Sequence, residues 1–273
     1  MEAWRILPFR KAGAAENMAV DEAIFQETVR QKTPPTLRFY GWQAPALSIG
    51  YFQDYEKEVD EEACRRFGVE IVRRPTGGKA VLHEQELTYA VIAGDAPLFP
   101  PDIPGTYRLI SRCIARGLHE IGIRAEMETA GRPVPDGALR SSCFSFPSHH
   151  ELCVAGRKIC GSAQMRSHGF FLQHGSLLLA FDPLRTCAVM LPHREPEQDA
   201  DRLRNAVTSV WEEAKSPIDE AGLSVALRKG FEEVLGIRFR EGDLTPDEER
   251  LADELIAKKY GGGSWNREGR RRE

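Results

Sequence analysis

The sequence predicts an α+β fold in which helices flank a mixed or largely antiparallel sheet. Short strand-like segments follow one another across turns, as in residues 36–51, where Pro45 separates two of them. A longer segment at 106–121 carries apolar residues at helical spacing. Adjacent strands on short turns, combined with separate helices, are typical of the α+β class.

The first 93 residues are predicted to form short strands and helices. Pro34 and Pro35 end the first helix, because proline lacks the N–H donor that a helix interior needs. Gly68 ends the second, as the left-handed residue typical of a helix C-terminus. The expected elements are helices at 17–30 and 55–67 and strands at 36–42, 46–51, 69–74, 80–83 and 87–93.

The rest of the chain is predicted to hold further strands between helices. Alternating residues on either side of Gly156 predict a hairpin, and the Thr245–Glu248 stretch forms a capping box with proline at the first helical position. We expect a catalytic domain at 1–240, followed at 241–273 by a helix and a loose basic tail. The expected elements are a helix at 106–121, a loop at 126–137, strands within 151–163 and 170–181, and helices at 224–235 and 245–260.

Composition excludes several classes of protein. The net charge of −4, from 37 basic and 41 acidic residues, argues against general nucleic-acid binding. No apolar run approaches the roughly 20 residues that span a bilayer, and the first residues lack a signal peptide's apolar core. Six cysteines in a chain of 273 residues do not make a disulfide framework. We therefore expect a cytoplasmic protein without nucleic-acid or membrane partners.

Residues 140–176 concentrate the reactive side chains, with three of the six cysteines and four of the seven histidines. Cys143 lies in a loop-like segment, fifteen residues before Lys158. A nearby cation lowers the pKa of a thiol, and the thiolate is the nucleophile, so this pair suggests acyl chemistry. The small residues Gly161, Ser162 and Ala163 would let a ligand approach the backbone closely.

Other interpretations of this stretch stay open from the residues alone. Cys143, His149, His150, Cys153 and Cys160 could form a zinc site, although their spacing matches no paired C-x-x-C pattern. Cys153 and Cys160 could be small strand residues, and Cys143 an inert loop thiol. Cys160, two residues after Lys158, is the second candidate for a nucleophile.

Several motifs together resemble the lipoate-protein ligase and octanoyltransferase family. They are RRPTGGKAVLH at 73–83, GRKICGSAQMR at 156–166 and QHGSLLL at 173–179, with NMAVDEA, RFYGW and LSIGYFQ before them. The resemblance covers about residues 4–239. It implies the biotin/lipoate ligase catalytic fold, related to class II aminoacyl-tRNA synthetases. The glycine pair is not a P-loop, because no GK[ST] follows it and no helix begins there.

The family divides by chemistry, and the cysteine decides the branch. Ligases activate free lipoate with ATP and lack a nucleophilic cysteine. Cys143-Phe144, fifteen residues before Lys158, resembles the LipM-type octanoyltransferases. The LipB type places its cysteine well after the lysine, and the LipL type, an amidotransferase between lipoyl domains, also uses a cysteine in this region. An ATP-dependent ligase, the amidotransferase and a non-catalytic carrier-binding relative stay as alternatives.

The resemblance implies octanoyl transfer from acyl carrier protein to Cys143, and then to a lysine of a lipoyl-domain protein such as the glycine-cleavage H protein. It implies a monomer that needs no ATP, metal or other cofactor. Lys158 would favour the thiolate and help to deprotonate the attacking amine. Donors near the glycine pair would stabilise the oxyanion. The residues implied for binding the acyl group or substrate are Arg73, Gly77, Gly78, His83, Gly161, Ser162, Ala163 and His174.

Overall fold

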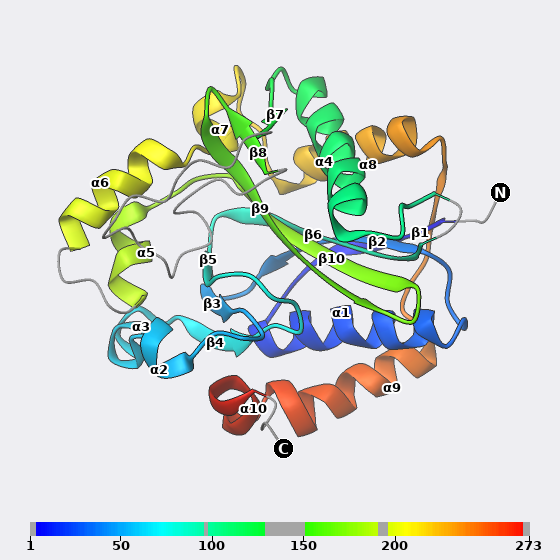
Figure 1. The fold of residues 1–273 in the computed structure, drawn as a ribbon, viewed down its shortest axis with the longest axis horizontal. Coiled ribbons are helices and arrows are strands. Elements are labelled where there is room, and N and C mark those ends of the chain that lie inside the picture. Colours follow the sequence, from blue (N-terminus) through cyan, green and yellow to red (C-terminus); the bar gives the residue numbers. More distant parts are fainter. Residues whose placement is uncertain (1–3, 96–97, 129–150, 191–195, 270–273) are drawn as a thin grey trace.

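The structure is a computed structural model that describes residues 4–95, 98–128, 151–190 and 196–269. Within these ranges the larger sheet has eight strands, in the order β11-β1-β2-β6-β10-β9-β8-β7 (Figure 1). The β11-β1-β2 pairs are parallel and the others antiparallel. Its strands are β1 (Trp4–Ala12), β2 (Thr36–Trp42), β6 (Glu86–Gly94), β7 (Glu126–Met127), β8 (Leu152–Val154), β9 (Arg157–Ser167), β10 (Phe170–Leu178) and β11 (Phe239–Glu241).

A smaller sheet of three strands stands beside the larger one in Figure 1. In the described residues β3 (Ala46–Ile49) is its central strand, parallel to β4 (Glu70–Arg73) and antiparallel to β5 (Val81–His83). Mixed sheets flanked by helices confirm the predicted α+β class. The hairpin around Gly156 is also confirmed, as the antiparallel pair β8 and β9.

Two pairs of helices cover the two faces of the larger sheet (Figure 1). On one face lie α4 (Ile103–Glu120) and α8 (Glu220–Leu235), which bury their apolar sides in one hydrophobic core. On the other lie α1 (Ala14–Val29) and α9 (Pro246–Leu255), with a second core. Close packing of α4 on α8 needs glycine, since a Cβ at Gly230 would lie 2.4 Å from the carbonyl oxygen of Cys113.

The remaining helices are short. The single helix predicted at 55–67 is two helices, α2 (Tyr55–Glu58) and α3 (Glu61–Phe67), because Asp60 is extended and its side chain caps α3. Gly68 ends α3 in the left-handed conformation, as predicted. None of the helices in the described ranges is long and apolar enough to cross a bilayer. The others are α5 (Pro183–Val189), α6 (Pro196–Ala206), α7 (Val210–Glu213), a π-helix (Ile256–Tyr260) and α10 (Gly263–Glu268).

Within the stretch predicted to be a loose tail, the described residues form α10. The Arg73 guanidinium donates to the carbonyl oxygens of Trp265 (3.2 Å) and Arg267 (3.0 Å). In return, the Trp265 indole N–H donates to the carbonyl oxygen of Arg73 at 2.9 Å. These bonds fix α10 against β4. The proposed domain boundary at residue 240 stays a prediction.

Three strand assignments differ from the sequence prediction. The first strand, β1, was not predicted, although it is the parallel neighbour of both β2 and β11. Residues Glu126–Met127, predicted to begin a loop, form β7 against β8. The strands expected around His174 are one continuous strand, β10, whose whole length pairs with β6.

Candidate active site

A pocket lies between the α1-covered face of the larger sheet and the smaller sheet. Its cavity volume is about 30 Å³, so the pocket is narrow in this structure. Glycines and apolar side chains form much of its wall. Two histidines and one arginine also line it. The lining residues are Met18, Tyr40, Trp42, Ser48, Arg74, Val81, His83, Thr88, Gly161, Ser162, Ala163, His174, Gly175 and Ser176.

Glycines bring the two predicted signature stretches together at this pocket. Gly78 has φ +87, a conformation that glycine adopts without strain. A Cβ at Gly50 would lie 1.9 Å from the Gly78 carbonyl oxygen, and one at Gly78 would lie 3.6 Å from the Cβ of Ala163. The glycine turn therefore packs between β3 and β9, with Gly78 beside the predicted small-residue segment, whereas a Cβ at Gly77 would meet only Phe52 within 4 Å.

The two neighbouring arginines have different positions. Arg73 is buried, does not line the pocket, and donates to backbone carbonyl oxygens of residues 50, 51 and 53 as well as to the C-terminal segment. Arg74 lines the pocket and donates to the carbonyl oxygens of Gly77 (2.8 Å) and Lys79 (2.7 Å). Sequence reasoning selected Arg73 and missed Arg74, which the paired arginines of the motif could have suggested. Arg73 supports the loops around the pocket, and Arg74 holds the glycine turn.

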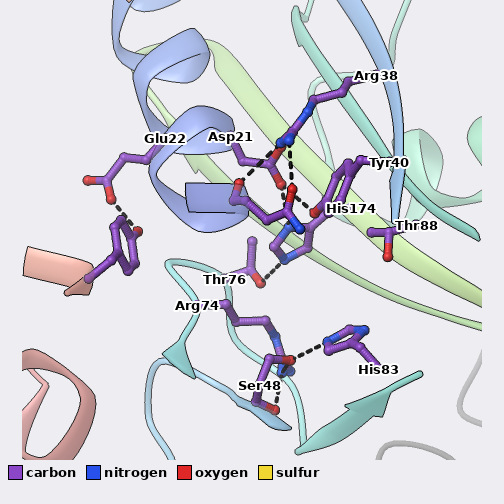
Figure 2. A network of polar contacts seen from close by, with 12 residues as sticks. Asp21, Glu22, Arg38, Tyr40, Ser48, Arg74, Thr76, His83, Thr88 and His174 are labelled. Carbon is purple, nitrogen blue, oxygen red and sulfur yellow. Dashed lines mark hydrogen bonds and ion pairs between the residues drawn. The ribbon is translucent and has the colours of Figure 1, made fainter. Parts of the chain in front are cut away.

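His174 lines the pocket and belongs to a buried polar network (Figure 2). Its Nδ1 lies 3.1 Å from Asp21 Oδ2, and its Nε2 lies 2.7 Å from Thr76 Oγ1. Burial alone would raise the pKa of Asp21, but the Arg38 guanidinium at 2.7 Å and His174 lower it. Burial lowers the pKa of His174 despite Asp21. Asp21 is thus an anion that accepts the Nδ1–H of a neutral His174, and Thr76 donates to Nε2.

His83 forms a second array of the same kind. Its Nδ1 lies 2.7 Å from Glu86 Oε1, its Nε2 lies 2.7 Å from Ser48 Oγ, and its ring stacks on Trp42 with 4.1 Å between centroids. Burial would raise the pKa of Glu86, but His83 and hydroxyl donors, Thr88 among them, lower it. Glu86 is therefore an anion that accepts the Nδ1–H of His83. Sequence reasoning identified both histidines but neither carboxylate.

Lys158 is fully buried at the start of β9, and it does not line the pocket. Its Nζ lies 2.5 Å from Glu151 Oε1, and its carbonyl oxygen accepts from the Thr208 N–H at 2.9 Å. Glu151 was not selected from the sequence. Cys143, the predicted nucleophile, lies outside the described residues. The part of the chain that is described therefore places a buried cation and its carboxylate partner in the predicted hairpin.

The described cysteines are all buried: Cys64, Cys113, Cys153, Cys160 and Cys187. Burial raises the pKa of the Cys64 thiol to about 12, that of Cys187 to about 12, and that of Cys113 further still. Cys160, the second candidate nucleophile, packs in the core beneath α4 and α8. The other three members of the possible zinc set lie outside the described residues. Buried thiols of raised pKa are poor nucleophiles at neutral pH.

Comparison with known proteins gives consistent matches over nearly the whole chain. The sequence pattern of the lipoyl protein ligase A/B catalytic domain matches residues 13–232. An octanoyltransferase LipM of Kyrpidia tusciae is 43% identical, over 97% of this chain and 99% of that protein. An octanoyltransferase LipM of Bacillus subtilis is 38% identical, over 97% and 98%.

Solved structures agree with these sequence matches. A putative lipoate protein ligase from T. acidophilum with bound lipoic acid superposes with a TM-score of 0.79 at 29% identity, covering 98% of this chain and 99% of that one. A lipoate-protein ligase A bound with ATP gives a TM-score of 0.77 at 29% identity, over 99% and 100%. The similarity thus extends from the sequence motifs to the whole arrangement of strands and helices.

Proposed function

The chain belongs to the lipoyl protein ligase A/B catalytic domain family, and we propose that within it this protein is an octanoyltransferase of lipoate biosynthesis. The observation that carries this proposal is its similarity, over nearly the full length of both chains, to octanoyltransferases LipM at 38–43% identity. The pocket between the two signature stretches offers a mainly apolar wall for an acyl chain and a few polar groups for its reactive end.

The proposed reaction proceeds in two transfers. An octanoyl group passes from the thioester of a carrier protein to the Cys143 thiol, which exchanges one thioester for another. It then passes to a lysine amine, and the amide that forms makes this step favourable. Covalent catalysis divides one difficult transfer into two easier ones. Because the thioester already carries the activation, neither transfer consumes ATP.

Each transfer forms a tetrahedral oxyanion that needs hydrogen-bond donors. Backbone N–H groups of Gly77 and Gly78 are the proposed donors, since this turn lies beside the pocket and against Ala163. Lys158 is proposed to supply a fixed positive charge that favours the Cys143 thiolate. Its pairing with Glu151 supports this role, because a neighbouring carboxylate favours the charged form of an amine.

The proposed donor is octanoyl-acyl carrier protein, and the proposed acceptor is a lipoyl-domain protein such as the glycine-cleavage H protein. The family supports a lipoyl-domain acceptor, because its members modify lipoyl proteins. We propose that the enzyme acts as a monomer in the cytoplasm, without a metal or other cofactor. An ATP-dependent lipoate ligase is the competing activity, and the two differ in whether free acid or thioester is the substrate.

Intact-mass spectrometry of the protein mixed with octanoyl-acyl carrier protein tests the proposal. We expect one octanoyl adduct that neutral hydroxylamine removes, without added ATP or magnesium. Cys143→Ala should abolish the adduct, whereas the matched variants Cys153→Ala and Cys160→Ala should keep it. A normal adduct on Cys143→Ala would contradict the assignment of the nucleophile. Modification from free octanoate that depends on ATP would indicate the ligase instead.

A further inference from the structure

Two histidines reach the pocket, and each is held in the same way by a carboxylate on Nδ1 and a hydroxyl on Nε2. Figure 2 shows Asp21 and Thr76 beside His174, and Ser48 beside His83. The arrays differ in where the hydroxyl lies. Ser48, the partner of His83, lines the pocket, whereas Thr76, the partner of His174, is fully buried and is not a lining residue. Only the His83 array therefore presents both its imidazole and its hydroxyl to the pocket within the described residues.

The hydrogen bonds fix the tautomer of His83. Glu86 is an anion and can only accept, so Nδ1 of His83 carries the proton and Nε2 carries the lone pair. Arg74 Nη1 donates to Ser48 Oγ at 3.1 Å, which leaves the hydroxyl proton of Ser48 to be donated to Nε2. The basic Nε2 of His83 therefore connects to the pocket through the Ser48 hydroxyl. A carboxylate behind the ring stabilises the imidazolium that protonation would form.

The second transfer needs such a base, because a lysine amine must lose a proton to become an amide. Lys158 is paired with Glu151, and an ammonium has no lone pair with which to accept a proton. Among the described lining residues, Arg74 stays protonated, and burial raises the pKa of the Tyr40 phenol far above its usual value. Burial lowers the pKa of His174, and its Nε2 faces the buried Thr76. His83 is the remaining described lining group whose hydrogen bonds leave a nitrogen lone pair on the pocket side, behind the Ser48 hydroxyl.

We propose that His83 is the general base of the second transfer, an inference that rests on the proposed octanoyltransferase function. The neutral acceptor amine attacks the thioester carbonyl, and the C–N bond forms. One amine proton passes to His83 Nε2, directly or through Ser48. The C–S bond breaks with its electron pair on sulfur, and the proton returns from His83 to the thiolate or leaves to water. The charged groups that face His83 in the described structure are Glu86 and the Arg74 guanidinium behind Ser48, and the titratable imidazole of His174 also interacts with it.

The test follows the decay of the pre-formed octanoyl-enzyme in a single turnover. His83→Gln keeps a side-chain amide but cannot titrate, and His168→Gln is the matched control, since His168 lies in the exposed turn between β9 and β10. With a lipoyl-domain acceptor, His83→Gln should slow transfer by about 10²–10⁴-fold, the usual contribution of general base catalysis. The control should transfer at the wild-type rate. Acylation by the carrier thioester provides the starting material in each case.

Hydroxylamine separates this role from damage to the pocket. It is already uncharged and nucleophilic at pH 7.5, so it needs little help from a base, and His83→Gln should release the octanoyl group to it at nearly the wild-type rate. Transfer to lysine at the wild-type rate by His83→Gln would overturn the inference. Equal slowing toward both nucleophiles would also overturn it, by making His83 a structural residue. If the wild-type protein forms no octanoyl-enzyme at all, the proposed function fails instead.

Discussion

Replacing Asp21 by asparagine should destabilise the protein more than any surface change, because this carboxylate joins three elements under the pocket. It is fully buried on α1 and accepts from Arg38 Nη1 (2.7 Å) and the Tyr40 hydroxyl (2.8 Å), both on β2. It also accepts from His174 Nδ1 (3.1 Å) on β10. Asparagine keeps the size and one acceptor oxygen but removes the charge.

The expected cost follows from what the substitution leaves behind. Arg38 would keep its bonds to the Asn17 carbonyl oxygen (3.1 Å) and Oδ1 (2.7 Å), but its buried charge would lose its only anionic partner that the described structure records. Breaking a buried ion pair by removing one partner costs about 3–5 kcal/mol. An effective dielectric constant of about 20 gives a similar attraction, roughly 4 kcal/mol for charges 4 Å apart. We therefore expect a loss of about 3–5 kcal/mol in the free energy of unfolding.

Equilibrium unfolding in urea, followed by far-UV circular dichroism, measures this loss. Asp201→Asn is the matched control, because Asp201 pairs with Arg204 on the exposed surface of α6, and it should leave the midpoint nearly unchanged. One ordinary hydrogen bond contributes about 1 kcal/mol to stability. A loss in the free energy of unfolding below about 1 kcal/mol for Asp21→Asn would therefore refute the expected loss of an ion pair. It would mean that the network tolerates a neutral residue at its centre.

Two further predictions concern the same region. Burial holds the pKa of His174 below its ordinary 6.5, so the unfolded chain binds this proton first as the pH falls. The free energy of unfolding should therefore decrease as the pH drops below about 6.5. In urea titrations from pH 7.5 to 5.5, His174→Gln should reduce this decrease, and an identical pH dependence in the variant would contradict the assignment. Gly175→Ala would place a Cβ 2.5 Å from Ser162 Oγ and 2.7 Å from the Gly161 carbonyl oxygen. It should cost about 1–3 kcal/mol in the same assay, whereas Gly263→Ala, where a Cβ meets nothing within 4 Å, should not.

Features that depend on neighbouring residues could be recognised in the sequence. Gly68 and Gly236 end their helices in the left-handed conformation, and Thr245 forms the predicted capping box with Glu248, because helix ends are satisfied within a few residues. The histidines His83 and His174 could be selected in the same way, from their motifs. Their side chains do line the pocket, His174 from within β10 and His83 from the end of β5.

The partners of those residues depend on pairing between distant strands, which no local pattern specifies. Asp21 meets His174 across 153 positions only because α1 packs on the face where β10 lies. Likewise β1 and β11, near opposite ends of the chain, pair in register from Trp4 and Phe239, and β11 has only three residues, too few to be recognised alone. The distinct positions of Arg73 and Arg74 follow from the opposite directions of successive side chains at a strand's end. The motif histidines can be recognised from local sequence. Which carboxylates lie beside them, and so decide their protonation, depends on the packing of elements far apart in the chain.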